Sequence, residues 1–597
     1  MATIKGGEFL IKELKSEDIF ISEEFNDEQK MMKEAVIDFI DREVWPYKER
    51  FENKDYALTE EVMRKAGEMG FLGVSIPEKY GGIGMGFVST MLVTDYMSSA
   101  TGSVGTAFGA HTGIGTMPIF LYGTEDQKNT YLPLLTSGEK FGAYCLTEPG
   151  AGSDANSGKT TAELTADGKH YKINGQKMWI SNAGFAEIFI VFARIEDDKN
   201  ITAFIMVFDK ENPNGVTLGA EEQKLGIHAS STRQVFFSDT LIPIENMLSE
   251  RGKGFKIAMN SLNVGRIKLG AACLDASRRI ITEAVNYGNE RKQFKTAISN
   301  FGAIQKKYAE MSTKTFAIDA GCYRAAKDIQ NMIDRLLADG KSHQDAELAA
   351  FQEYAIECAI IKVYASEVSQ FVSDEGIQIF GGMGFSKDTP MESAWRDARI
   401  TRIYEGTNEI NRLLTVGMLL KKAMKGEIDV ITPAMEVGNS LMGIPSFETP
   451  DFSEILSEEK AMVEKLKKAF LMVAGKAVQT FGMELDNHQQ LILAAAEIMI
   501  EIYMAESAIL KAEKIVKSTS EKEAECQIAM AKLNLFNAVE TASSFGKEAI
   551  LYVAEGDEQR MMLMGLKRFT KYVNNPNPIA LRKVIAEKVI AENKYCF

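Results

Sequence analysis

The sequence predicts a mainly helical protein with one compact β domain in the middle of the chain. Apolar residues recur with helical periodicity from about residue 26 to 140, from about 251 to 425, and from about 453 onwards. Between the first two of these regions, short segments rich in β-branched and aromatic residues alternate with turn-forming residues. Because 597 residues are too many for one hydrophobic core, several domains are expected.

The first helical region opens at Asp27, in "DEQKMMKEAVIDFIDREVWP". Met31, Val36 and Phe39 fall on one helical face, and Pro46 ends the helix soon afterwards. Two glycine-rich stretches follow, "KYGGIGMGF" and "GSVGTAFGAHTGIGTM". Neither follows a strand with the Gly-x-Gly-x-x-Gly spacing of a dinucleotide-binding loop, so we interpret both as tight connections between helices.

The β domain is predicted from "EIFIVFARI", "ITAFIMVFDK" and "TRQVFFSDTLIP", which turn-formers such as "DKENPNG" separate. After the second helical region, "GEIDVITPAMEVGNSLMGIPSFETPDFS" contains three of the 13 prolines and is typical of a linker. The predicted organisation is an N-terminal extension (1–25), an N-terminal α domain (26–141), a central β domain (142–250), an α-bundle domain (251–425), a linker (426–452) and an additional helical domain (453–597).

Composition excludes several classes of protein. The formal net charge of −15 argues against nucleic-acid binding as the role of the whole chain. Six cysteines without a Cys-x-x-Cys pair indicate a reducing compartment, and the five histidines have no metal-ligand spacing, so no metal site is expected. The acidic N-terminus resembles neither a secretory signal nor a transit peptide, and no run of about 18 apolar residues predicts a membrane span.

One carboxylate stands out, Glu405 in "RIYEGTNEI". Apolar residues lead into it, Gly406 follows it, and Thr407 is a good N-cap for the next helix. Glu405 is therefore expected just outside a helix start, on backbone that Gly406 allows to bend sharply.

Three other segments are candidates for ligand contacts, each with a plain alternative. In "YCLTEPGAGSDA", the backbone N–H groups and the Thr147 and Ser153 hydroxyls could cradle a polar heterocycle or phosphate, or form an ordinary turn. In "KMWISNAG", Trp179 is either a core residue or a cofactor contact. The glycines of "QIFGGMGF" would by themselves be a helix C-cap.

In combination and order, these segments resemble the acyl-CoA dehydrogenase family of flavoproteins. The resemblance runs from about residue 26 to 425 and leaves the last domain unaccounted for. The matching stretches are "YGGIGMG", "YGTEDQKNTYLPLLTSGEK", "LTEPGAGSDA", "GQKMWISNAG", "KLGIHASSTRQVFF", "ERKQF", "QIFGGMGF" and "RIYEGTNEI".

The resemblance implies a fold and a reaction. The expected fold has an N-terminal α domain, a central β barrel and a four-helix C-terminal domain, with FAD at their junction and the extra helical domain added. The expected reaction is α,β-dehydrogenation of a fatty acyl-CoA to the trans-2-enoyl-CoA, with electrons leaving through electron-transfer flavoprotein. Glu405 matches the base that removes the α-proton while a β-hydride moves to flavin N5. The family's enolate donors are the backbone N–H of this base and a ribityl hydroxyl of FAD.

The resemblance also assigns ligand contacts. Residues that match FAD contacts are Tyr144, Cys145, Leu146, Thr147, Ser153, Trp179, Ile180, Ser181, Thr407 and Glu409. Those that match contacts to the FAD of a neighbouring subunit are Arg291, Gln293, Gln378, Gly381 and Gly382. Those expected at the acyl-CoA are Ser153, Asn263, Arg266, Tyr404, Glu405 and Gly406.

Two departures from the family indicate a subgroup. Some members carry the base at the position of Gly265, which cannot act, so Glu405 is the only candidate. Gly302 replaces a flavin-contacting glutamine of many relatives, so that contact is expected to be absent. With the added domain, both features are similar to the very-long-chain acyl-CoA dehydrogenase branch, whose members are homodimers. The lack of a targeting peptide suggests a bacterial cytoplasmic enzyme.

Alternatives remain open at this stage. Lys567, Arg568, Lys571, Arg582 and Lys583 concentrate positive charge near the C-terminus, which suits peripheral contact with an anionic membrane or a solvated helix face. Besides the dehydrogenase, an acyl-CoA oxidase and a flavin-bearing assembly or scaffold protein stay possible as functions. The acyl chain length cannot be read from these motifs.

Overall fold

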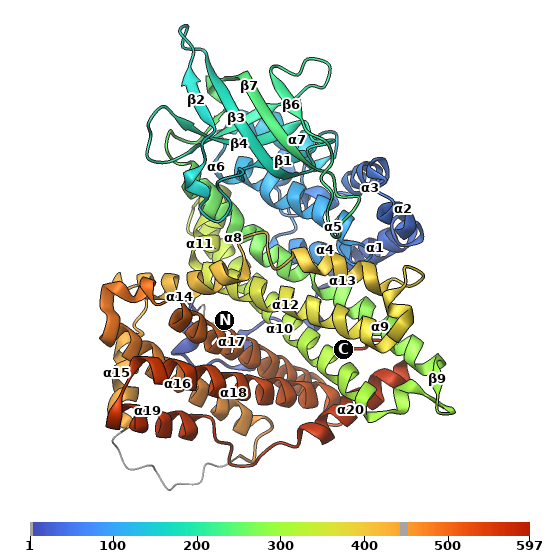
Figure 1. Cartoon of the computed structure of the whole chain (residues 1–597), viewed down its shortest axis with the longest axis vertical. Coiled ribbons are helices and arrows are strands. Elements are labelled where there is room, and N and C mark those ends of the chain that lie inside the picture. The colour runs from blue at the N-terminus through green and yellow to red at the C-terminus, as the bar shows by residue number, and fades with distance from the viewer. Residues whose placement is uncertain (1–3, 442–451) are drawn as a thin grey trace.

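The computed structural model describes residues 4–441 and 452–597. The β domain forms one end of the molecule and the last helical domain the other, with the long helices of the central bundle between them (Figure 1). The predicted order of helices, β domain, helices and further helices is confirmed.

The N-terminal domain is helical. Its first helix, α1 (Asp27–Glu43), starts where the sequence predicts, because Asn26 accepts a hydrogen bond from the Gln29 N–H. The remaining helices are α2 (Lys48–Glu52), α3 (Tyr56–Glu68), α4 (Phe87–Met97), α5 (Gly102–Gly109), α6 (Met117–Tyr122) and α7 (Glu125–Thr136).

The prediction that residues 102–117 form a connection is wrong. Helix α5 continues into a π-helical turn, Ala110–Gly115, and then into α6. Val104, Ala107 and Phe108 of α5 are buried. Their apolar contacts outweigh the low helix propensity of the glycines in this stretch.

Eight strands form one mixed sheet in the order β6-β7-β3-β2-β4-β5-β8, with β1 also paired to β4. The pairs of β4 with β1 and with β2 are parallel, and the other pairs are antiparallel. Among the described residues the two end strands, β6 and β8, do not pair, so the expected barrel is an open sheet by its hydrogen bonds. The strands are β1 (Gly142–Cys145), β2 (Thr161–Leu164), β3 (His170–Ser181), β4 (Ile188–Ile195), β5 (Thr202–Val207), β6 (Val216–Leu218), β7 (Thr232–Pro243) and β8 (Met247–Leu248).

Helix α12 (Ala355–Phe380) is the centre of the bundle and packs on α8, α9, α10 and α14. It is apolar around most of its circumference, which is typical of a helix buried on all sides. The other elements here are α8 (Gly254–Ala272), α9 (Leu274–Glu290), the hairpin of β9 (Lys292–Gln293) and β10 (Thr296–Ala297), α10 (Gly302–Ala338), α11 (His343–Glu353), α13 (Met391–Ile400) and α14 (Asn408–Met424).

The segment predicted as a linker, 426–452, contains a helix, α15 (Ile431–Ser440). Residues 442–451 of this segment lie outside the described residues. The additional domain comprises α16 (Ser457–Phe481), α17 (Gln489–Ser518), α18 (Glu525–Val553), α19 (Gly556–Phe569) and α20 (Pro578–Glu592). Helices α17 and α18 pack directly on α10. Within the described parts of the chain, no helix is long and apolar enough to cross a membrane.

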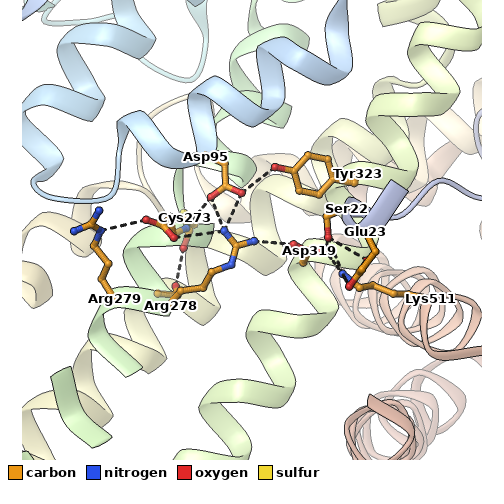
Figure 2. Close-up of polar contacts among 11 residues, drawn as sticks. Ser22, Glu23, Asp95, Cys273, Arg278, Arg279, Asp319, Tyr323 and Lys511 are labelled. Carbon is orange, nitrogen blue, oxygen red and sulfur yellow. Dashed lines mark hydrogen bonds and ion pairs between the residues drawn. The ribbon is translucent and has the colours of Figure 1, made fainter. Parts of the chain in front are cut away.

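A buried chain of charges ties four parts of the molecule together (Figure 2). Arg278 of α9 donates to Asp95 of α4 at 3.0 Å and to Asp319 of α10 at 2.7 Å. Asp319 also pairs with Lys511 of α17, which lies 3.1 Å from Glu23 in the N-terminal segment. The additional domain, through Lys511, and the N-terminal segment, through Glu23, are therefore linked by ion pairs to Asp95 in the N-terminal domain.

Candidate active site

Glu405 lies in a tight turn between α13 and α14. Thr407 caps α14 as predicted, because its hydroxyl oxygen accepts a hydrogen bond from the Ile410 N–H at 3.3 Å. Gly406 has a φ of 82°, and Glu405 itself has a φ of 58°. The sequence predicts the bend at the glycine but not the left-handed conformation of the glutamate, which costs about 1–3 kcal/mol and is typical of functional sites.

The carboxylate of Glu405 packs against the backbone of α8 at Gly265. A Cβ atom at residue 265 would lie only 2.6 Å from Oε2 of Glu405, so the glycine makes room for the carboxylate. Oε2 is buried and has no hydrogen-bond partner among the described residues. A buried carboxylate oxygen without a partner is costly, which marks this position as one where a ligand is expected.

Burial raises the pKa of Glu405 to about 7, although the positive charges of Arg266 and Lys362 oppose the shift. A carboxyl group with this pKa is substantially ionised at neutral pH and is a much stronger base than an ordinary glutamate. The pocket therefore tunes the acid–base strength of this residue toward general-base chemistry.

Three side chains hold the backbone of the turn. Arg266 Nε donates to the Glu405 carbonyl at 3.2 Å, Asn411 Nδ2 donates to the Gly406 carbonyl at 2.7 Å, and Lys362 Nζ donates to the same carbonyl at 2.8 Å. Within the described residues the Glu405 N–H donates to no protein group. It is left available as a donor.

Tyr144, on β1, lies close enough to Glu405 to interact with its charge from the β domain. Its hydroxyl is buried without a partner in the described chain. Burial raises the pKa of Tyr144 above its ordinary value, and the charge of Glu405 adds to the shift, so the two groups are electrostatic neighbours.

Trp179 is not a core residue. Its side chain is 52% exposed and its φ is 59°, at a bulge where β3 shifts register against β7. Bulges often re-aim a side chain beside a functional site. The structure therefore removes the core alternative for Trp179 that the sequence left open.

The other predicted contacts on the β domain differ in exposure. Ser153 is exposed and Thr147 and Ser181 are half-buried, whereas Cys145, Leu146 and Ile180 have buried side chains. A buried ion pair between Lys177 and Glu148, at 2.6 Å, anchors the turn that carries Thr147. On α8, Asn263 accepts a hydrogen bond from Arg266 at 2.9 Å.

A second group of predicted residues lies away from Glu405. These residues are exposed at the ends of α9 and α12, and β9 is well separated from β1 in Figure 1. The two helix ends are joined by stacking of Tyr287 on Phe380, with ring centroids 4.1 Å apart. Arg291, Gln293, Gln378, Gly381 and Gly382 lie at or just beyond these two helix ends, and their contact with the FAD of a second subunit stays a prediction.

Sequence reasoning missed Lys362 and Asn411. Lys362 lies in "CAIIKVYA", where one lysine interrupts an apolar helical run. A charged residue in a stretch that reads as buried is expected to have a specific partner, so this signal was available. Asn411 stands in the "GTNEIN" motif itself.

Family models match most of the chain. Residues 26–139 match the N-terminal domain of acyl-CoA dehydrogenases, residues 143–240 the middle domain and residues 252–418 the C-terminal domain. Residues 465–568 match a further model described as an acyl-CoA dehydrogenase C-terminal domain. The additional domain thus has its own counterpart among these proteins.

Individual proteins similar to this chain belong to the same family as the matching models. A probable acyl-CoA dehydrogenase of Bacillus subtilis is 40% identical over 99% of this chain and 98% of its own length. The human mitochondrial very long-chain specific acyl-CoA dehydrogenase is 37% identical over 70% of this chain and 60% of its own. A crystal structure of an acyl-CoA dehydrogenase complexed with FAD from Bacillus anthracis superposes with a TM-score of 0.95, at 41% identity and full coverage of both chains.

Proposed function

The chain belongs to the acyl-CoA dehydrogenase family, and on that premise we propose that it oxidises long-chain fatty acyl-CoA with Glu405 as the base. FAD-dependent acyl-CoA dehydrogenation is the activity of the enzyme at the level of the family. The residue roles, the chain length and the electron acceptor are our proposals.

The partnerless Oε2 of Glu405 is the observation that carries the proposal. An α-proton of a thioester is weakly acidic, so a base with a pKa of about 7 removes it far more readily than an ordinary glutamate would. Gly265 leaves the carboxylate space on α8 without covering it with another polar group. In this site Glu405 takes the proton on an oxygen to which no donor of the described residues is bonded.

The residues around the pocket fit a flavin. Trp179 offers an exposed ring on the β domain, and the Tyr144 hydroxyl lacks a partner among the described residues. Bound FAD supplies the hydride acceptor that α,β-dehydrogenation requires. We assign the cofactor to the contacts matched by the family resemblance, Tyr144 to Thr147, Ser153, Trp179 to Ser181, Thr407 and Glu409, with Arg291, Gln293, Gln378, Gly381 and Gly382 supplied by a second subunit of a homodimer.

The enolate that forms on proton removal needs hydrogen-bond donors. The N–H of Glu405 has no hydrogen-bond partner among the described residues, and Arg266 Nε donates to the carbonyl of Glu405 at 3.2 Å. We propose that this N–H donates to the thioester oxygen. The left-handed φ of Glu405 determines the direction of the donor.

Long-chain substrates are proposed from the 37% identity to the human very long-chain specific enzyme. Electron-transfer flavoprotein as acceptor, a homodimer and the bacterial cytoplasm as location rest on the same resemblance. Membrane contact by the basic C-terminal residues also stays a prediction.

Anaerobic titration of the purified, FAD-loaded protein with acyl-CoA from short to very long chains tests this function. We expect bleaching of the flavin absorbance, strongest with long chains, and reoxidation by electron-transfer flavoprotein rather than by air. Prompt peroxide formation would instead show an oxidase. Bound FAD that no acyl-CoA bleaches would leave a scaffold role.

The residue assignment is tested by Glu405→Gln, which keeps the shape of the side chain but cannot accept the proton. The expected variant binds FAD and acyl-CoA and loses about 10³-fold or more in turnover, the scale of removing an essential base. A variant that keeps more than a tenth of the turnover would contradict the assignment.

A further inference from the structure

We propose that Lys362 is the positioning residue of the catalytic turn, holding the Glu405–Gly406 peptide in place and setting the charge environment of the base. This inference rests on the proposed role of Glu405. The hydrogen bonds of Lys362 go to the Gly406 carbonyl and to Asn408 and not to the Glu405 carboxylate, so Lys362 acts on the reaction through Glu405.

Lys362 is hydrogen-bonded directly to the catalytic turn. Its side chain is fully buried in α12, and its ammonium donates to the Gly406 carbonyl at 2.8 Å and to Asn408 Oδ1 at 2.7 Å. Gly406 follows Glu405 in the chain, so this contact restrains the peptide next to the base. Asn411, on α14, donates to the same carbonyl at 2.7 Å.

Further contacts hold the lysine itself. Asn408 donates to Ser366 Oγ at 3.1 Å and to Glu367 Oε1 at 2.9 Å. Glu367 forms a two-point ion pair with Arg412, at 2.8 and 2.9 Å. This arrangement fixes the position of Asn408, and through it the direction in which the Lys362 ammonium points.

The electrostatic part of the proposal follows from the groups that face Glu405. These groups are Arg266 on α8, Lys362 on α12, Tyr144 on β1 and Tyr404 in the turn itself. The ammonium of Lys362 in turn faces Glu405, Arg266, Cys273 and Glu367. Removing its charge leaves Arg266, among the described residues, as the remaining cation that opposes the effect of burial, so the pKa of Glu405 would rise further above about 7.

The chain provides a matched control in Lys268. It is also buried, lies on α8, and donates to Thr112 Oγ1 at 2.6 Å, but it makes no hydrogen bond to the catalytic turn. Burial lowers the pKa of Lys268 to about 7 and that of Lys362 to about 8, so Lys268→Met removes a buried lysine of similar acidity at another place in the fold.

The experiment compares Lys362→Met, Lys362→Gln and Lys268→Met as FAD-loaded proteins. In the parent, kcat/KM for a long-chain acyl-CoA should rise with pH to a plateau through a midpoint near 7. In Lys362→Met the midpoint should move up by about one unit, with a tenfold or greater loss at pH 7 that is partly recovered at pH 9. Lys362→Gln keeps a donor for the Gly406 carbonyl without the charge, so it should show the shifted midpoint with a smaller loss on the plateau.

A second measurement does not depend on turnover. Infrared spectroscopy of the substrate-free proteins follows the protonated carboxyl band that Glu405→Gln removes. Its midpoint should move upward in both Lys362 variants and stay at the parent value in Lys268→Met. An unshifted midpoint in a folded, yellow Lys362 variant, or an equal shift in Lys268→Met, would overturn the proposal. A parent without any such band near pH 7 would instead contradict the role of Glu405.

Discussion

The buried carboxylates of Asp95 and Asp319 and the buried carboxylate of Glu405 differ in their hydrogen bonding. In the network of Figure 2, Asp95 accepts hydrogen bonds from the Asp275 N–H, Arg278 and Tyr323. Asp319 accepts from Arg278, Lys511 and Ser22. In the catalytic pocket, Oε2 of Glu405 has no partner among the described residues.

The difference separates carboxylates that hold the fold from the one that reacts. Burial alone would lower the pKa of Lys511, but the charges of Asp319 and Glu23 outweigh it and raise that pKa. Around Glu405 the opposing cations are too weak to cancel burial, so its pKa is raised to about 7. Burial also raises the pKa of Asp95 in the network to about 7, so the partnerless oxygen, and not the raised pKa alone, distinguishes Glu405 from Asp95. A satisfied network stabilises the folded chain, whereas an unsatisfied carboxylate costs stability and stays open to a ligand.

The largest effect is expected from Lys511→Met. It leaves Asp319 buried without its ammonium partner, so the free energy of unfolding should fall by about 3–5 kcal/mol in urea titrations. The pH midpoint of kcat/KM in the remaining folded enzyme should not move. A loss below about 1 kcal/mol would show that the network does not hold the additional domain.

Glu405→Gln, in contrast to Lys511→Met, should raise the free energy of unfolding. Between pH 4.5 and about 7 the folded chain binds the Glu405 proton more tightly than the unfolded chain, so ionisation destabilises the fold as pH rises. The variant should therefore match the parent at pH 4.5 and exceed it by up to about 3 kcal/mol at pH 8. Equal unfolding free energies at pH 8 would mean that the carboxylate is not destabilised in the pocket.

A moderate loss of activity is expected from Gly265→Ala. The new Cβ would lie 2.6 Å from Oε2, so the carboxylate must move. A displacement of this size should lower kcat about 10–100-fold while FAD stays bound. Gly417→Ala, at an exposed helical glycine with no atom near its Cβ position, is the control and should leave kcat unchanged. Similar kcat values for both variants would argue against contact of Gly265 with the base.

The smallest effect is expected at a surface ion pair that joins the additional domain to the N-terminal segment. Lys517 lies 2.6 Å from Glu17, but the two side chains are 48% and 61% exposed. Lys517→Met should cost less than about 1 kcal/mol in the same urea titrations, less still in high salt. A loss comparable to that of Lys511→Met would remove the distinction between buried and exposed pairs.

Local signals in the sequence predicted much of the fold. The Asp27 helix start, the Thr407 cap and the β-rich middle region depend on periodicity and capping, which neighbouring residues determine. The stretch 102–117 was misassigned because its glycines suggested turns, whereas burial of Val104 and Phe108 decided for helix. Tertiary contacts of this kind are not visible in a local pattern.

The candidate site is likewise predictable only where a local motif marks it. A motif marks Glu405, but its contact with Gly265 joins positions 140 residues apart, and no local pattern specifies that contact. The support from Lys362 is likewise long-range, 44 residues from Gly406 in sequence. The exposure of Trp179 depends on a bulge set by the register of β3 on β7.

The most direct test is a ¹³C NMR titration of the Glu405 carboxyl in the FAD-loaded, substrate-free protein, with Glu405→Gln to assign the signal. The buried, partnerless carboxylate predicts a midpoint at about pH 7. A midpoint near 4, the value of an ordinary glutamate, would contradict the account of Glu405 as a base made strong by its surroundings.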